Sequence, residues 1–200
     1  MPVARGWTTR DVRALMDESR PWPRYELIAG ELLVTPAPAT AHQIATGELM
    51  RMLADYVDAH GIGVACTSPA DLELQPGTIT QPDVFVIRAH SRGAHDDSAS
   101  WEGITSLLLA VEVISPYTGR QDRVTKRDFY LGADVAEYWV VDLDARLVER
   151  WTPDRATPQL ERGTFAWPPA GAPAPLMVDV AALFARVERK VRLIAARGRG

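Results

Sequence analysis

The amino-acid sequence predicts an α/β (α+β) fold in which helices flank a mixed central β-sheet, with an N-terminal hairpin. Strand-like and helical segments alternate along the chain, an order typical of mixed folds. Residues 107–114 are apolar at every position but one, which is typical of a central strand covered on both faces. Residues 25–28 and 32–35 flank an Ala29-Gly30 turn and predict the hairpin. With 200 residues and 46% hydrophobic content, the chain can fold as one domain without disulfides.

Proline and glycine limit the elements that precede the central strand. A short helix is predicted from Thr8 or Thr9 to about residue 19, and the prolines that follow end it. Residues 41–60 give the clearest helix, because apolar residues recur every three to four positions and a glycine follows. Short strands are expected next, over residues 63–66, 71–74 and 83–87, followed by a polar loop over 90–100.

The second half of the chain predicts a helix, a hairpin and a closing helical segment. The expected elements are a helix over 120–131, a hairpin of strands 137–142 and 146–151, a strand over 160–166, and a helix or helix pair over 179–196. We therefore expect a single domain over residues 1–200. It would have an N-terminal helix within 1–20, a Pro-rich linker at 168–175 and a C-terminal helical appendage at 176–200.

The charge and cysteine content exclude several classes of protein. Lys and Arg number 22 against 26 Asp and Glu, and the net charge of −4 argues against a strongly basic nucleic-acid coat protein. Cys66 is the only cysteine, so neither an internal disulfide nor a multi-cysteine metal site can form. The longest apolar run, residues 107–114, is too short to span a bilayer and contains Glu112. No apolar signal segment is evident, so we expect a cytoplasmic protein that does not bind a membrane.

Three residues in chain order form the strongest candidate site. Asp83 opens an apolar strand, Glu112 interrupts another strand, and Lys126 lies on the helix that follows. An ionised carboxylate in a buried strand is costly unless it is paired or bound to a metal. If Asp83 and Glu112 lie on adjacent strands and face the same side, they form the pair of hard oxygen ligands that Mg²⁺ or Mn²⁺ prefers.

Lys126 is also unusual in composition. Only Lys126 and Lys190 are lysines, and the other 20 cations are arginines. On its predicted helix, Lys126 shares one face with Asp122, Phe129 and Tyr130. A compact ammonium there can orient a water molecule or stabilise negative charge that develops on a phosphate. The sequence indicates no comparable role for Lys190.

Each of the three residues also has a purely structural interpretation. Asp83 follows a proline and can be a turn residue. Glu112 can pair with an arginine in the core, and Lys126 can extend to the surface or pair with Asp122. Their order, and their placement on two strands and a helix, favour a functional site.

A longer series of motifs surrounds these residues. It comprises Tyr25-Glu26-Leu-Ile-Ala-Gly30-Glu31-Leu, His42, Pro82-Asp83, Val-Glu112-Val-Ile-Ser-Pro, Asp122-x-x-x-Lys126-x-x-x-Tyr130 and Glu137-Tyr138-Trp139-Val-Val-Asp142. Over about residues 20–185 this series resembles the Uma-type putative restriction endonucleases, which belong to the PD-(D/E)XK nuclease superfamily. The ordered series is specific for the family, whereas a single motif is not.

The resemblance implies a restriction-endonuclease-like core that binds a divalent metal and hydrolyses phosphodiester bonds in DNA. Asp83 matches the aspartate of the PD motif, and Glu112 matches the acid of (D/E)XK. The superfamily lysine stands two residues after this acid, where this chain has Ile114. Lys126 matches a placement in which the lysine has moved to the next helix. One or two Mg²⁺ ions would polarise the phosphate and activate the attacking water.

Four further residues are expected to support the site. His42 and Glu31 match family positions and are expected to line the site from the first long helix and the hairpin. Asp122 lies one helical turn before Lys126. Tyr130 lies one turn after Lys126, where it can donate a hydrogen bond or pack in the core.

Three classes of function follow from this pattern. The first is a metal-dependent DNA endonuclease. The second is a catalytically inactive binding or assembly module on the same fold, and the third is a metal-dependent hydrolase of a smaller phosphate ester. A homodimer is expected, because two-fold symmetry is common among oligomers and suits the cutting of both strands of a duplex.

Overall fold

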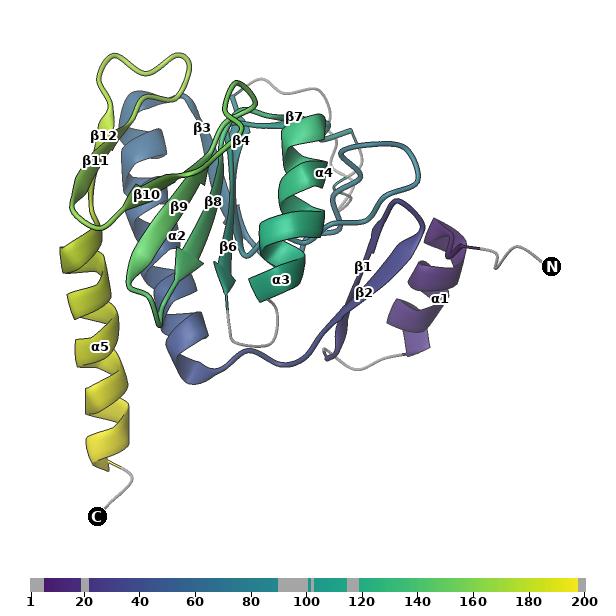
Figure 1. Ribbon diagram of the computed structural model, residues 1–200, viewed down its shortest axis with the longest axis horizontal. Helices are drawn as coiled ribbons and strands as arrows, with labels where there is room; N and C mark the ends of the chain where they lie inside the picture. The colour runs from purple at the N-terminus through teal and green to yellow at the C-terminus, as the bar shows by residue number, and fades with distance from the viewer. Residues whose placement is uncertain (1–5, 19–21, 90–100, 102, 115–118, 198–200) are drawn as a thin grey trace.

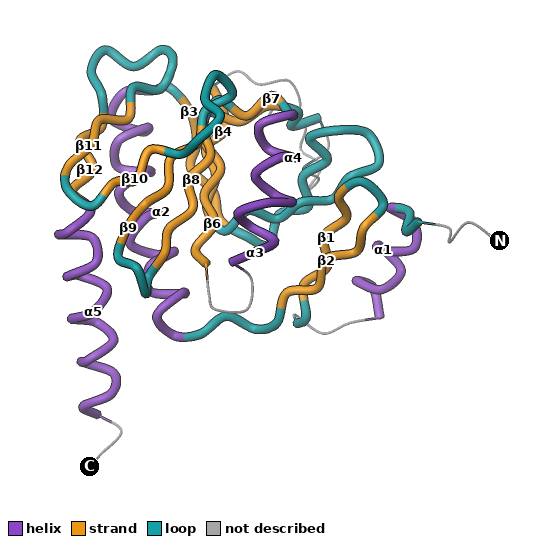
Figure 2. The backbone as a smooth tube through the Cα atoms, in the orientation of Figure 1, coloured by secondary structure: helices purple, strands orange, loops and turns teal. Residues whose placement is uncertain are grey.

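The computed structural model describes residues 6–18, 22–89, 101, 103–114 and 119–197. Its centre is a six-stranded mixed sheet with the strand order β10-β9-β8-β6-β4-β3 (Figures 1 and 2). The strands are β3 (Gly63–Thr67), β4 (Val84–Arg88), β6 (Leu109–Ile114), β8 (Tyr138–Asp142), β9 (Leu147–Trp151) and β10 (Gln159–Glu161). β6 and β8 are parallel and every other neighbouring pair is antiparallel, so the predicted mixed sheet is confirmed.

Helices cover both faces of this sheet, as predicted. α2 (Thr40–His60) and α5 (Val180–Arg197) lie on one face, and α3 (Gly119–Gln121) and α4 (Arg127–Gly132) lie on the other (Figure 1). β6 is buried at every position, because alternate side chains contribute to the two apolar clusters on the two faces. Val111 and Val113 face α2 and α5, and Ala110 and Ile114 face the side of α4. Glu112, between Val111 and Val113, therefore faces the side of α4.

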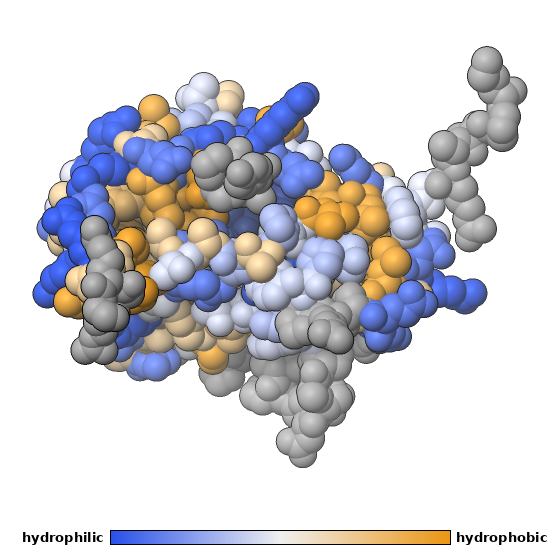
Figure 3. Space-filling view, turned by 90° about the horizontal axis from the view of Figure 1, so that it is seen from below, coloured by the Kyte–Doolittle hydropathy of each residue, from blue (hydrophilic) through white to orange (hydrophobic). Residues whose placement is uncertain are grey.

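The N-terminal residues form a small lobe beside the sheet. β1 (Arg24–Ile28) and β2 (Glu31–Thr35) form an antiparallel hairpin, as the turn at Ala29-Gly30 predicted. α1 (Thr9–Glu18) packs on β1 of this hairpin. The lobe has its own apolar cluster, centred on Val12, Leu27 and Ile79. Viewed from below, hydrophobic side chains lie at the surface in separate areas on the α5 side and on the N-terminal side (Figure 3).

Short elements complete the fold. β5 (Ser106–Leu107) pairs in parallel with β7 (Asp134–Val135), and β11 (Thr164–Trp167) pairs with β12 (Leu176–Asp179). Among the described residues, no helix is long and apolar enough to cross a membrane. The expected polar loop at 90–100 lies outside the described residues.

Two of the predicted strands are corrected by the structure. Residues 71–74 form only one isolated bridge, from Leu72 to Thr80, so the predicted strand is wrong. Leu72 and Leu74 are both buried, and their alternation reflects that burial rather than a ladder of backbone hydrogen bonds. The strand expected over 160–166 is two strands, β10 and β11, which belong to different sheets.

The C-terminal segment is integrated with the core. Residues 168–175, the expected linker, connect the paired strands β11 and β12. α5 is one helix rather than a pair, and its buried Leu183, Phe184 and Val187 join the cluster formed with α2. The segment expected to be an appendage thus packs through its first turns, because those turns carry an apolar stripe.

Glu48 of α2 is the centre of a charge cluster that links α2 to α5 through ion pairs. Its side chain is fully buried, and its carboxylate accepts hydrogen bonds from Arg51 at 2.5 Å and from Arg186 at 2.8 Å. Lys190 pairs with the same carboxylate. Burial opposes ionisation, but the three cations hold the pKa of Glu48 below its ordinary value. Glu48 is therefore ionised in the folded protein at neutral pH.

We expect Glu48→Gln to lower the free energy of unfolding by about 1–2 kcal/mol at pH 7, because charge-assisted hydrogen bonds are lost while the exposed cations regain water. A lowered pKa means that this contribution is complete above the ordinary value of 4.5 and is lost as the pH falls through the folded-state value. Urea unfolding of the wild type and of Glu48→Gln, at pH 7 and at a pH low enough to protonate Glu48, measures this difference in the free energy of unfolding. Glu188→Gln, at a more exposed carboxylate on α5, is the control. A deficit in Glu48→Gln that stays constant with pH would contradict the assignment.

Candidate active site

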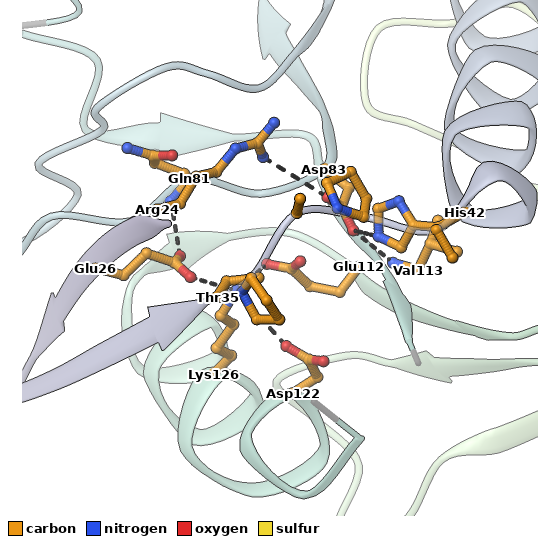
Figure 4. A pocket seen from close by; sticks show the side chains of 14 residues that line it. Arg24, Glu26, Thr35, His42, Gln81, Asp83, Glu112, Val113, Asp122 and Lys126 are labelled. Atoms are coloured by element: carbon orange, nitrogen blue, oxygen red, sulfur yellow. Dashed lines mark hydrogen bonds and ion pairs between the residues drawn. The ribbon is translucent and has the colours of Figure 1, made fainter. Parts of the chain in front are cut away.

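The strand register brings the two predicted acids together. β4 and β6 are antiparallel, with Val84 opposite Val111 and Phe85 opposite Ala110. Continued by one residue, the same register places Asp83 opposite Glu112. Directly opposite residues of an antiparallel pair point to the same face of the sheet. Asp83 lies directly before β4 rather than within it, and its carboxylate and that of Glu112 on β6 line one pocket, as expected for acids on one face of the sheet (Figure 4).

A π-helical turn places the lysine over this face. The predicted helix at 120–131 is interrupted at Asp122–Lys126, where the backbone is wound as a π-helix between α3 and α4. Both Asp122 and Lys126 are buried there. π-helical turns are rare and occur frequently at functional sites. The irregular turn directs a carboxylate and an ammonium into the pocket from the same helix.

Lys126 is surrounded by three carboxylates from different parts of the fold. Its Nζ lies 2.7 Å from Glu26 Oε2 and 3.0 Å from Glu112 Oε1. Asp122 Oδ1 is 3.6 Å away. Only 6% of the lysine side chain is exposed, so Lys126 is a buried part of the site and not a surface cation. Despite burial, the negative charges of Glu112, Glu26 and Asp122 raise the pKa of Lys126 well above its ordinary value.

His42 and a backbone amide hold Asp83. His42 Nε2 lies 3.0 Å from Asp83 Oδ2, and the Val113 N–H donates to the same oxygen at 2.9 Å. His42 Nδ1 is buried and has no hydrogen-bond partner among the described residues. Burial opposes ionisation, but the His42 hydrogen bond and the Val113 amide hold the pKa of Asp83 below its ordinary value. Asp83 is therefore an ionised carboxylate that is held in one orientation.

The pKa of Glu112 is shifted in the opposite direction from that of Asp83. Burial raises its pKa well above the ordinary value, and the charges of Asp83, Asp122 and Glu26 act in the same direction against Lys126. The Tyr130 hydroxyl donates a hydrogen bond to Glu112 Oε1 at 3.2 Å. Burial and the neighbouring Glu112 also raise the pKa of Tyr130 well above its ordinary value, so the phenol remains a donor.

The pocket has a volume of about 350 Å³ and is lined by fourteen residues. They are Arg24, Glu26, Thr35, Pro36, Ala37, Pro38, Ala39, His42, Gln81, Asp83, Glu112, Val113, Asp122 and Lys126. The chain between β2 and α2 forms one wall, and the sheet and the π-helical turn form the others (Figure 4). The site is thus a small pocket between the N-terminal lobe and the sheet.

The charges of the pocket fit a divalent cation. Four acidic side chains line it, and Lys126 and Arg24 are its permanent cations, so the acidic groups outnumber the cations. Within the described residues, no three His, Cys, Asp or Glu side chains are placed to hold a metal ion together. Mg²⁺ is typically held by one or two carboxylates, with waters and substrate phosphates as its other ligands. Asp83 and Glu112 match that kind of site.

The structure brings together most of the residues expected in the site. Of the supporting residues, His42 and Asp122 line the pocket and Tyr130 contacts Glu112. Glu31 does not line it and is exposed at the start of β2. The carboxylate that the hairpin does supply is Glu26, whose Oε1 accepts the Gln81 N–H at 2.8 Å.

Glu26 and Arg24 are functional candidates that sequence reasoning missed. Glu26 carried the same signal as Glu112, a lone carboxylate within an otherwise apolar strand segment. Arg24 carried no signal of its own, because the sequence contains 20 arginines. Alternate residues of a strand share one face, so the two side chains reach the pocket together from β1.

Comparisons with known proteins agree with this architecture. Residues 11–179 match the model of the Uma2 family, which is described as putative restriction endonucleases. The structure is similar to a crystal structure of a putative nuclease belonging to DUF820 from Anabaena variabilis ATCC 29413, with a TM-score of 0.69 and 20% sequence identity over 88% of this chain and 98% of that chain. At this identity the likeness shows a shared fold. Comparison with curated proteins finds no match.

The family match spans most of the chain, including every residue of the pocket. It agrees with the family that the ordered motifs resemble. The chain therefore belongs to the Uma2 family of putative restriction endonucleases.

Proposed function

We propose that the chain is a divalent-metal-dependent endonuclease that hydrolyses phosphodiester bonds in DNA, with Mg²⁺ or Mn²⁺ held by Asp83 and Glu112. The observation that carries the proposal is the facing pair of carboxylates, Asp83 directly before β4 and Glu112 on β6, inside a pocket where Lys126 lies 3.0 Å from Glu112. Membership of a family described as putative restriction endonucleases supports a nucleic-acid substrate.

The protein's own residues prepare this chemistry in distinct ways. A bound divalent ion would polarise the phosphate and lower the pKa of the attacking water. Asp83 is fixed in one orientation by His42 and the Val113 amide, so its carboxylate is ready to bind. Glu112 is oriented by Lys126 and Tyr130 through the same oxygen, Oε1, which leaves Oε2 for a ligand.

Lys126 has the role of a fixed positive charge. Its ammonium stabilises Glu112 and lies in the pocket that would receive the phosphate. A preorganised cation in a buried site stabilises developing negative charge more strongly than in water. Three carboxylates hold Lys126 in place, so it needs no reorganisation when charge develops.

We expect Asp83→Asn and Glu112→Gln each to reduce Mg²⁺- or Mn²⁺-dependent nicking of plasmid DNA by more than about 100-fold. Mutation of residues that only hydrogen-bond to metal ligands typically lowers metal affinity or activity by about 10–100-fold, and loss of a ligand itself should cost more. Conversion of supercoiled to open-circular plasmid measures the rate. Asp128→Asn is the matched control, because Asp128 is an exposed acid outside the pocket that pairs with Arg127. Equal cleavage by the wild type and Asp83→Asn would refute the assignment of this site.

Metal binding separates an active site from an inactive module on the same fold. We expect titration calorimetry to show Mn²⁺ binding to the wild type and to Asp128→Asn, and its loss in Glu112→Gln, because one of two carboxylate ligands is removed. Binding that is unchanged in Glu112→Gln would contradict the metal site. Cleavage of a small phosphodiester such as bis(p-nitrophenyl) phosphate, without cleavage of DNA, would instead favour a hydrolase of smaller esters.

A further inference from the structure

We propose that Arg24 is the phosphate-binding residue of this site, so that its guanidinium receives a phosphate group of the DNA backbone beside Asp83. This inference rests on the proposed function and adds to it the residue that holds the substrate. Arg24 lies on β1 and lines the pocket, and its side chain is 16% exposed. Figure 4 shows it on the opposite side of Asp83 from His42.

Lys126, the other permanent cation of the pocket, already contacts carboxylates of the protein. The Nζ of Lys126 lies 2.7 Å from Glu26 and 3.0 Å from Glu112, and its ion-pair contact with Asp122, at 3.6 Å, is longer than a hydrogen bond. Donors that are committed to carboxylates cannot also hold a phosphate without breaking buried ion pairs, which is costly. A cation with fewer carboxylate contacts is therefore better placed to bind a phosphate directly.

Arg24 has donors to offer. Among the described residues, its one ion-pair contact is Nη1 to Asp83 Oδ1 at 4.0 Å, which is beyond hydrogen-bond distance. A guanidinium has five N–H donors in a planar fork that matches two oxygens of a phosphate. The Arg24 side chain is largely buried, and its guanidinium, which lacks a close acceptor at the pocket, is available to an added anion.

The position of the Arg24 guanidinium is fixed before any ligand binds. Its Cζ lies 4.4 Å from the centre of the Trp22 ring, a cation–π stack that limits the side chain's rotation. Two residues along the same strand, Glu26 is anchored to Lys126 and to the Gln81 amide. Stacking and strand anchoring together place the guanidinium next to the candidate metal ligand Asp83.

The charge of the pocket is consistent with this role. With a divalent cation bound, the four carboxylates would be balanced by that ion, Lys126 and Arg24. A phosphate would then meet no net repulsion, although the whole chain carries a net charge of −4. A local cation rather than a basic surface would thus receive the DNA backbone.

The test measures DNA binding apart from cleavage. Fluorescence anisotropy with a fluorescein-labelled DNA duplex is recorded in the Glu112→Gln background, where the strands stay intact and the loss of the metal is accompanied by the loss of one pocket carboxylate. We expect Arg24→Gln to weaken binding about 10–100-fold, and Arg24→Lys to weaken it less, because lysine keeps the charge without the fork. The slope of log affinity against log salt should fall by about 0.9 for one lost phosphate contact. Arg51→Gln, which removes an equal charge from a surface cation outside the pocket, should leave the affinity nearly unchanged.

A purely structural role for Arg24 gives a different result. If Arg24 only balanced Asp83, Arg24→Gln would disturb metal binding and leave DNA affinity as in Arg51→Gln, and that outcome would overturn the proposal. We expect Arg24→Gln in the wild-type background to bind Mn²⁺ at least as tightly as the wild type, since a nearby positive charge is removed. A joint loss of Mn²⁺ and DNA binding in both Arg24 variants would also overturn it. Failure of the proposed function shows separately, as absence of metal-dependent cleavage by the wild type.

Discussion

The burial of Lys126 among three carboxylates is the interaction on which the site depends. Glu26 comes from the N-terminal hairpin, Glu112 from the centre of the sheet, and Asp122 from the same helix as the lysine. One ammonium therefore joins the lobe, the sheet and the π-helical turn around a single pocket. Removing the lysine would leave buried like charges that repel each other, which is among the costly changes in a protein interior.

The two lysines of the chain have related roles in different places. Lys126 contacts buried acids at the candidate active site, and Lys190 pairs with the buried carboxylate of Glu48 between α2 and α5. The surroundings differ, because the side chain of Lys190 is 42% exposed and that of Lys126 is 6% exposed. The cations around the buried Glu48 reach water, whereas Lys126 and its three carboxylates are all buried. The contrast is consistent with a structural role for the cluster at Glu48 and a functional role for the cluster at Lys126.

Strand periodicity predicted the sheet and drew attention to Glu112, whereas Asp83 was identified by its place after Pro82 and by the family motif, and the pairing of the two acids was a conditional expectation. A lone carboxylate in an apolar strand identifies Glu112, and Asp83 lies where the register brings it opposite. The hairpin was found, but the expected site residue was Glu31, whereas the structure uses Glu26. Side-chain direction in a short strand depends on what packs against it, and the contact with Lys126 comes from far along the chain. The π-helical turn likewise has no periodic signal in the sequence, and its buried Lys126 contacts residues from the hairpin and the sheet.

The most direct test of the account is a crystal structure of the wild-type protein soaked with Mn²⁺, with the ion located by its anomalous scattering. We predict an ion bound by carboxylate oxygens of both Asp83 and Glu112, with Lys126 still paired to Glu112 and waters completing the coordination. An ion bound elsewhere, or no ion between these two carboxylates at a saturating Mn²⁺ concentration, would contradict it.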